Sequence, residues 1–187
     1  MGPLTLLSVP GWAGSGPNHW MSLWERDDRQ IVRIEQADWD NPDPEVWTSE
    51  LEAGVQRAAT TVVVLIAHSL GVLTVQRWAQ PGENRVACAF LVTPPDPDEL
   101  EAHTAINAFG PIRASVLPFP SLVVASRDDL YCKFSRAEEF ARAWGAKFVD
   151  AGNAGHLNTD SGYGPWPEGK TLLADLIRAN SGTPPNF

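Results

Sequence analysis

The sequence has 187 residues, of which 43% are hydrophobic and 20% are charged, a balance typical of one folded domain rather than a disordered chain. Its 23 Asp and Glu residues outnumber 14 Lys and Arg residues, and the formal net charge is -9. This charge argues against a binding surface for nucleic acid or for an anionic membrane, and it favours a small-molecule or protein substrate.

Cysteine usage and hydropathy predict where the protein resides. Cys88 and Cys132 are too few for a disulfide framework and have no zinc-like spacing, so a reducing compartment fits best. The N-terminal stretch lacks the features of a signal peptide, and no apolar run approaches the length of about 18 residues that a membrane helix needs. We therefore expect a cytoplasmic protein without membrane contact, and a monomer, with a homodimer as the alternative.

Short runs rich in Val, Ile and Leu predict six strands, and helical spacing of apolar residues between them predicts helices. The strands are expected at 4–9, 31–35, 61–67, 86–92, 121–126 and 146–150, and the clearest helices at 44–59, 70–80, 134–145 and 168–180. Most strand runs are continuously apolar, which is typical of strands buried on both faces. The sequence thus predicts an α/β three-layer sandwich, with a mostly parallel sheet of about six strands and helices on both faces.

The segment 94–120 interrupts this alternation, because it contains six prolines and only a weak helical pattern at 98–107. We expect it to form a long connection over the strand ends. No repeat or low-complexity linker divides the chain. Residues 1–180 are therefore predicted to form a single domain, and 181–187 a C-terminal tail.

The stretch AHSLG joins the third predicted strand directly to a helix. Ser69 has Ala67 two residues before it and Gly71 two residues after it, which is the pattern of a nucleophile elbow with alanine in place of the first glycine. Small flanking residues are needed because strand and helix approach closely at such a turn. The alternative is an ordinary serine that caps the helix.

A serine nucleophile needs a general base that is oriented by a third group. Asp128 and Asp129 follow the strand 121–126, and His156 follows the strand 146–150. The carboxyl ends of parallel strands share one edge of a sheet, where ligands bind. The order Ser, Asp, His is also that of α/β-hydrolases. From the residues alone, either aspartate could orient His156 while the other braces the turn.

The three other histidines are weaker candidates for the base. His19 is expected in the loop after the first strand, and His103 lies in the proline-rich segment. His68 precedes Ser69, so its side chain should point away from the catalytic hydrogen bond.

The loop after the first strand, SVPGWAGSGPNHW, is expected to supply the oxyanion hole. Gly11 can turn the backbone inward, so the N–H groups of Trp12 and Leu70 become the predicted donors. A nucleotide-binding loop is the competing interpretation of GWAGSG, but the G-x-G-x-x-G order and a phosphate-binding lysine are both missing.

Five segments, in the same order, carry a resemblance that spans nearly the whole chain. They are PGWAGSGPNHW, IAHSLG, LVTPPDPD, PFPSLVVASRDDLYC and GHLNTDSGYGPWPEG. With these the chain resembles the small single-domain serine hydrolases of the α/β-hydrolase superfamily, which include retinoblastoma-binding protein 9 and the bacterial YdeN-like proteins. The chain departs from that pattern at Leu130, where members often carry proline.

The resemblance implies a minimal α/β-hydrolase fold without a large cap domain and a triad of Ser69, Asp129 and His156. It also implies hydrolysis of carboxylic esters or related acyl compounds, with a small-molecule ester as substrate and no cofactor or metal. Trp12 and Trp166, in loops beside the catalytic segments, are expected to line the substrate pocket, although large aromatics more often pack in a core. The alternatives are a protein-binding module with a weak or vestigial triad, and an amidase or peptidase.

Overall fold

The computed structural model describes residues 3–58, 60–83, 85–99 and 104–181. Its centre is a six-stranded sheet in the order β2-β1-β3-β4-β5-β6, in which all neighbouring strands are parallel. The strands are β1 (Leu4–Val9), β2 (Ile31–Arg33), β3 (Val62–His68), β4 (Val86–Val92), β5 (Ser121–Ala125) and β6 (Lys147–Asp150). The six predicted strands are confirmed, with ends that shift by one or two residues.

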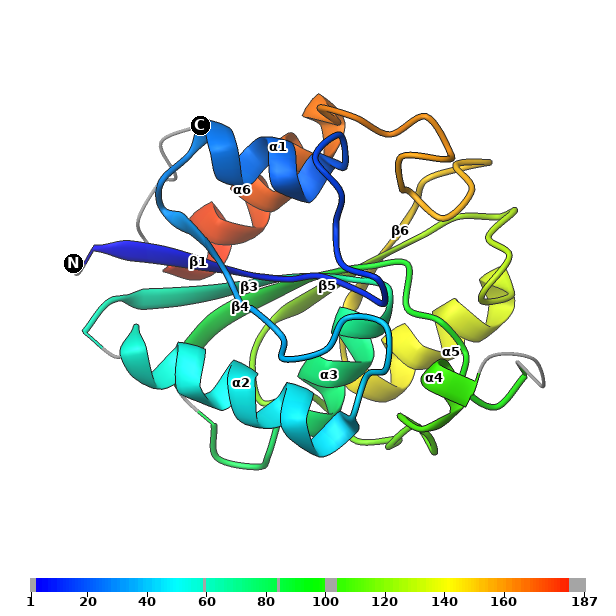
Figure 1. Ribbon diagram of the computed structural model, residues 1–187, viewed down its shortest axis with the longest axis horizontal. Coiled ribbons are helices and arrows are strands. Elements are labelled where there is room, and N and C mark those ends of the chain that lie inside the picture. The colour runs from blue at the N-terminus through cyan, green and yellow to red at the C-terminus, as the bar shows by residue number, and fades with distance from the viewer. Residues whose placement is uncertain (1–2, 59, 84, 100–103, 182–187) are drawn as a thin grey trace.

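Helices cover both faces of the sheet, so the predicted three-layer α/β architecture is confirmed (Figure 1). The helices are α1 (Trp20–Asp27), α2 (Pro44–Arg57), α3 (Leu70–Trp78), α4 (Thr104–Asn107), α5 (Phe134–Trp144) and α6 (Pro167–Ser181). Helices α1 and α6 lie on one face, and α2, α3 and α5 lie on the other.

The predicted end of the domain lies close to residues outside the described ranges, and the predicted weak helix at 98–107 includes some of them. Helix α6 continues to Ser181, one residue beyond the predicted end of the domain, and residues 182–187 of the predicted tail lie outside the described residues. Of the weak helical pattern at 98–107, only Thr104–Asn107 is helical among the described residues.

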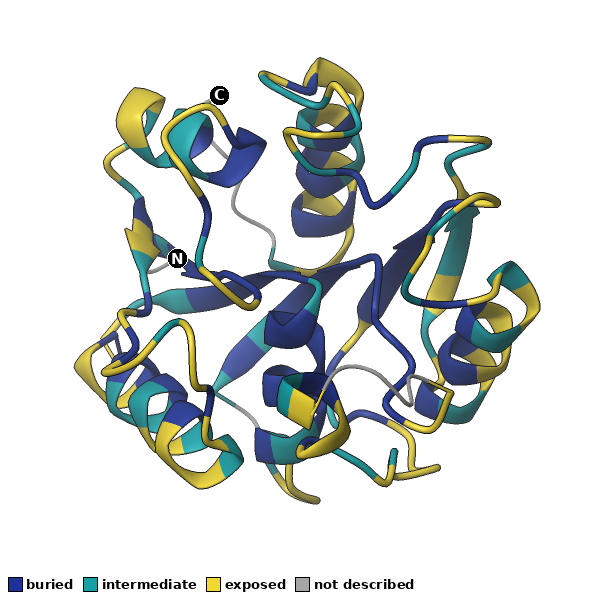
Figure 2. Ribbon diagram, turned by 45° about the vertical axis from the view of Figure 1, so that its right-hand side comes forward, coloured by how far each residue is buried: buried dark blue, intermediate teal, exposed yellow. Residues whose placement is uncertain are grey.

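The sheet is buried on both faces because each strand directs alternate side chains to opposite cores. In β3, Val64 and Ile66 pack with the apolar residues of α1 and α6. Val63, Leu65 and Ala67 pack with those of α2, α3 and α5. Figure 2 shows the strands largely buried, whereas the helices expose residues on their outer sides. This two-sided burial explains the continuous aliphatic run that precedes Ser69.

Two helix ends follow directly from the residues that flank them. Helix α2 begins at Pro44, which needs no hydrogen-bond partner at a first helical position, and the Asp43 carboxylate accepts from the backbone N–H groups of Glu45 and Val46. Helix α5 ends at Gly145, whose φ of 67° and ψ of 22° are left-handed, a conformation that glycine adopts without strain.

Helix α1 is not predicted from the sequence. It has eight residues, and its N-cap is His19, whose Nδ1 accepts from the backbone N–H of Met21. Histidine is an uncommon cap, and the preceding Gly-Pro-Asn sequence favours a loop. The sequence feature that could have predicted this helix is the spacing of Trp20 and Trp24. Residues four positions apart lie on the same face of a helix, and both indoles are fully buried against the sheet.

The strand order reverses direction at β1. Strand β2 pairs with one edge of β1, and the next strand in the chain, β3, pairs with the opposite edge of β1. The carboxyl ends of the strands at such a reversal are the usual ligand position in open α/β sheets. Among the described helices, none is long and apolar enough to cross a membrane.

Candidate active site

Ser69 occupies the sharp turn between β3 and α3. Its backbone has φ 53° and ψ −126°, a combination that side-chain-bearing residues rarely adopt. The residue stands at the N-cap position of α3, but its side chain makes no capping hydrogen bond. Instead, Ser69 Oγ lies 2.8 Å from His156 Nε2. The structure thus excludes the capping alternative for this serine.

Glycines allow the loop after β1 to press against this turn. A Cβ on Gly71 would lie 2.0 Å from the backbone oxygen of Val9, so any larger residue there would force strand and helix apart. A Cβ on Gly11 would lie 2.7 Å from Ser69 Cβ. The backbone that leads into Trp12 is therefore packed against Ser69 and against Leu70, the residue at which α3 starts. Both predicted oxyanion donors belong to segments that flank the serine.

His156 lies between Ser69 and Asp129. Its Nδ1 is 2.9 Å from Asp129 Oδ1 and 3.0 Å from Asp129 Oδ2. The side chains of His156 and Asp129 are 8% and 3% exposed, so this pair is well shielded from water. The backbone N–H of Tyr131 also donates to Asp129 Oδ1 at 2.9 Å, which fixes the carboxylate. The structure brings together the three residues that the resemblance implies.

Asp128 has a different environment from its neighbour. Its Oδ1 accepts from the Ser126 hydroxyl at 2.7 Å and from the Gly155 N–H at 2.8 Å. These hydrogen bonds lower the pKa of the Asp128 carboxyl and keep it charged. Asp128 therefore ties the turn after β5 to the loop that leads to His156, and does not contact the imidazole.

Two more histidines stand in a row with His156. The ring centroid of His68 lies 5.0 Å from that of His156 and 4.8 Å from that of His19. Burial, and then the neighbouring histidines, lower the pKa of His68 well below its usual value. Burial, Arg33 and His156, in that order, lower the pKa of His19 to about 4. His19 and His68 are thus neutral at neutral pH.

The neutral tautomers follow from the hydrogen-bond partners. A carbonyl oxygen can only accept, so His68 carries its proton on Nε2, which donates to the backbone oxygen of His156 at 2.9 Å. His19 Nδ1 accepts from the Met21 N–H at 3.2 Å, so its proton is on Nε2. His68 supports the backbone of His156 and takes no part in the hydrogen bond between Ser69 and His156.

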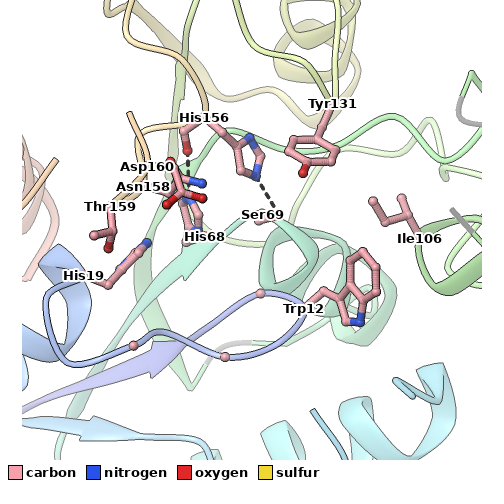
Figure 3. Close-up of a pocket in the computed structure, with 13 residues that line it drawn as sticks. Trp12, His19, His68, Ser69, Ile106, Tyr131, His156, Asn158, Thr159 and Asp160 are labelled. Carbon is pink, nitrogen blue, oxygen red and sulfur yellow. Dashed lines mark hydrogen bonds between the residues drawn. The ribbon is translucent and has the colours of Figure 1, made fainter. Parts of the chain in front are cut away.

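A cavity of about 210 Å³ opens above Ser69. Figure 3 shows Ser69 and His156 between two unlike groups of side chains. His19, His68, Asn158, Thr159 and Asp160 form the polar side, and Trp12, Ile106 and Tyr131 form the apolar side. Trp12 thus lines the cavity as expected, and its indole Nε1 donates to the backbone oxygen of Asp40 at 2.9 Å.

The expectation for Trp166 is wrong. Trp166 is 7% exposed and is absent from the cavity lining, because its indole packs into the core beside α1. Its ring centroid lies 5.2 Å from that of Trp20 and 5.9 Å from that of Trp24. Gly169 provides the space, since a Cβ there would lie 2.4 Å from the indole. A position in a loop near the site was not sufficient evidence for a pocket residue.

Sequence reasoning missed most of the cavity lining. Asn158, Thr159 and Asp160 lie two to four residues after His156 in the loop that follows β6, a signal that could have identified them. Tyr131, two residues after Asp129 in the loop beyond β5, carried the same signal, whereas Ile106 had none. His103, one of the weaker candidates for the base, lies outside the described residues. Within the described ranges, no group of three or more His, Cys, Asp or Glu side chains is placed to hold a metal ion.

Known proteins provide independent evidence on this chain. The model of the Serine hydrolase family matches residues 6–175. A YdeN-like hydrolase from Pectobacterium atrosepticum shares 36% identity, with a TM-score of 0.84 and 95% of this chain and 92% of that chain covered. Among curated proteins, none is significantly similar to this chain.

More distant structures share the fold. The ydeN gene product of B. subtilis is 20% identical, with a TM-score of 0.76 and coverage of 95% of this chain and 100% of that chain. Est1E from Butyrivibrio proteoclasticus, solved with ferulic acid bound, is 15% identical, with a TM-score of 0.69 and coverage of 94% and 90%. The family match over most of the chain, together with the relative at 36% identity, shows that this protein belongs to the Serine hydrolase family and is a hydrolase of the α/β-hydrolase fold.

Proposed function

We propose that the protein is a serine esterase that cleaves carboxylic esters through Ser69, His156 and Asp129. The observation that carries this proposal is the continuous hydrogen-bonded series from Ser69 Oγ to His156 Nε2 at 2.8 Å and from His156 Nδ1 to the Asp129 carboxylate at 2.9 Å. Such a series lets the imidazole accept the serine proton while the carboxylate stabilises the resulting imidazolium.

In the first half of the reaction, Ser69 Oγ bonds to the ester carbonyl carbon and His156 Nε2 takes its proton. The backbone N–H groups of Trp12 and Leu70 stabilise the oxyanion, aided by the positive N-terminal end of α3. The tetrahedral intermediate then collapses, the bond to the alcohol oxygen breaks, and His156 returns the proton to the leaving alcohol. The acyl group remains on Ser69.

In the second half, a water molecule gives a proton to His156 and bonds to the acyl carbon. Collapse of this second intermediate releases the carboxylic acid and returns the proton to Ser69. The proposed steps use neither a metal nor an organic cofactor. Cys88 and Cys132 are both free and buried, which fits the proposed cytoplasmic location.

The size of the cavity favours compact substrates. Its volume of about 210 Å³ lies below the range of about 300–1,000 Å³ that is usual for drug-sized ligands. A small-molecule ester therefore fits the site better than a folded protein. The same three residues could also cleave an amide, and the alternative of a pure binding module predicts an unreactive serine.

Covalent labelling tests the proposal. A fluorophosphonate probe should label the wild-type protein on the peptide that contains Ser69, and Ser69→Ala should abolish both labelling and hydrolysis of p-nitrophenyl acetate. Circular dichroism of the variant should match that of the wild-type protein. Hydrolysis that persists in Ser69→Ala would overturn the assignment of the nucleophile. A folded wild-type protein that takes no label would favour the binding module instead.

A further inference from the structure

The polar side of the cavity contains a hydrogen-bond donor that the proposed hydrolytic steps do not use. His19 is only 5% exposed, yet it lines the cavity, and Figure 3 shows its ring directed toward the part where Asn158, Thr159 and Asp160 lie. Its proton is on Nε2, because Nδ1 accepts from the Met21 N–H. Within the described parts of the chain, no hydrogen bond occupies this Nε2–H.

The neighbouring groups limit what can accept this hydrogen bond. Asn158 Oδ1 already accepts from the N–H and the hydroxyl of Ser161, at 3.0 and 2.8 Å, so its amide NH₂ is the remaining polar group. Thr159 adds a hydroxyl and Asp160 a carboxylate, and the described lining holds no Lys or Arg. A substrate carboxylate or phosphate would therefore meet the charge of Asp160 with no cation in the lining to offset it, and the charge of Arg33, which acts on His19, is already paired with Glu25.

A hydroxyl group of the substrate can pair both with the hydrogen-bond donor and with the acceptors of the polar side. Its oxygen can accept from His19 Nε2–H, and its own proton can be donated to Asp160 or Thr159. An ammonium group could bind Asp160 but has no lone pair for His19. An alkyl group would leave the buried donor unpaired, which is how a polar site rejects an analogue that lacks the polar group.

We propose that the polar side of the cavity is a subsite for a small, uncharged, hydroxyl-bearing group of the substrate, and that His19 donates its Nε2–H to that hydroxyl oxygen. The apolar side, formed by Trp12, Ile106 and Tyr131, takes the other portion of the ester. This inference rests on the proposed esterase function, and the hydroxyl can belong either to the acyl group or to the alcohol.

Two pairs of esters of matched shape distinguish these two sources. The acyl pair is p-nitrophenyl glycolate against p-nitrophenyl propanoate, and the alcohol pair is 2-hydroxyethyl acetate against propyl acetate. For each pair, the ratio of the two kcat/KM values is compared between the wild-type protein and His19→Asn. Intrinsic reactivity differs within a pair, but it cancels in this comparison. Asparagine keeps an oxygen that can cap α1 while it removes the imidazole donor.

In one of the two pairs, we expect the wild-type protein to have the higher kcat/KM for the hydroxylated ester. The ratio of the two kcat/KM values in that pair should fall about threefold to tenfold in His19→Asn, as for the loss of one uncharged hydrogen bond. Thr159→Val, on the same side, should lower the same ratio. Ile106→Ala, on the apolar side, should change the kcat/KM values of both members of the pair and leave their ratio intact. A ratio that His19→Asn leaves unchanged in both pairs would overturn the proposal while the esterase function stands.

A binding measurement tests the subsite without any hydrolysis. In the Ser69→Ala protein, glycolamide should shift the ¹⁵N signal of His19 Nε2, and propanamide at the same concentration should not. Equal responses to both amides, or no response to either, would contradict the subsite whether or not the wild-type protein is an esterase. A selective response to glycolamide in Ser69→Ala, together with a folded wild-type protein that takes no fluorophosphonate label at Ser69, would support the subsite and reject the esterase function.

Discussion

Asp128 and Asp129 are adjacent in the chain, but only Asp129 touches His156. Asp129→Asn should lower kcat by about 10³- to 10⁴-fold, because an amide favours the wrong imidazole tautomer and cannot stabilise the imidazolium charge. Steady-state hydrolysis of p-nitrophenyl acetate measures this effect.

Asp128→Asn is the matched comparison at the neighbouring position. It weakens the bonds to Ser126 and Gly155, so it should lower the free energy of unfolding by about 1 kcal/mol and lower kcat by less than about tenfold. If the two variants lost activity equally, Asp129 would not be the group that orients His156.

The backbone of Ser69 gives a second prediction at the residue scale. Its φ of 53° and ψ of −126° strain any residue that has a Cβ, whereas glycine adopts them freely. Ser69→Gly should therefore be about 1 kcal/mol more stable than Ser69→Ala, although both lack the nucleophile. Urea unfolding of the two variants measures the difference. A more stable alanine variant would show that the turn is not strained.

At the scale of elements, α1 is connected to the loop that follows His156. Trp20 Nε1 donates to the backbone oxygen of Leu157 at 2.9 Å, and Trp24 Nε1 donates to that of Pro165 at 2.7 Å. Trp20→Phe should cost about 1–3 kcal/mol of stability, because it leaves a buried carbonyl oxygen unpaired. It should also lower kcat, since Leu157 is the residue next to His156.

Trp24→Phe is the control for this effect, because it makes the same change on the same helix. Its partner, Pro165, lies farther along the loop from His156. Because Pro165 is exposed and water can replace the indole there, we expect a smaller loss of stability, measured by urea unfolding, and a smaller change in kcat. Equal losses of kcat in the two variants would mean that α1 supports the site only through overall stability.

The strands and the neighbourhood of Ser69 and His156 could be predicted from the residues and the choice of Asp129 from the resemblance, whereas α1 and the residues of the cavity walls could not. The run that ends in Ala67 is continuously apolar because both of its faces are buried, so local composition reveals it. Trp166 shows the limit of such reasoning. Its indole turns into the core because α1 and Gly169 provide a place for it, and those contacts come from distant parts of the chain. Local sequence cannot distinguish a loop side chain that faces the cavity from one that faces the core.

For the whole molecule, the buried histidines predict acid sensitivity. The pKa of His19 falls from 6.5 to about 4 on folding, so between these values the unfolded chain binds more protons than the folded protein. The free energy of unfolding must then decrease as the pH decreases through this window, by about 2 kcal/mol between pH 6.5 and pH 5 for His19 alone. His68, whose pKa is also lowered, adds a loss of the same sign.

A comparison with His19→Asn isolates this contribution. Urea unfolding at pH 6.5 and at pH 5 should show a smaller decrease in stability for the variant than for the wild-type protein, because asparagine does not titrate. The carboxylates are common to both proteins and cancel in the difference, and burial, the largest cause of the lowered pKa of His68, is also common to both. The same decrease in both proteins would show that His19 titrates normally in the fold.

The bond from Trp20 to Leu157 joins residues that are 137 positions apart, and it has a consequence for chains that are unfinished or cut. During synthesis, the AHSLG turn leaves the ribosome long before residues 156 and 157 exist. Until the C-terminal part folds against α1, Ser69 has no imidazole beside it, and under the proposed mechanism its hydroxyl is then no more reactive than that of any other serine. A truncated fragment that contains the nucleophile is therefore expected to be chemically inert.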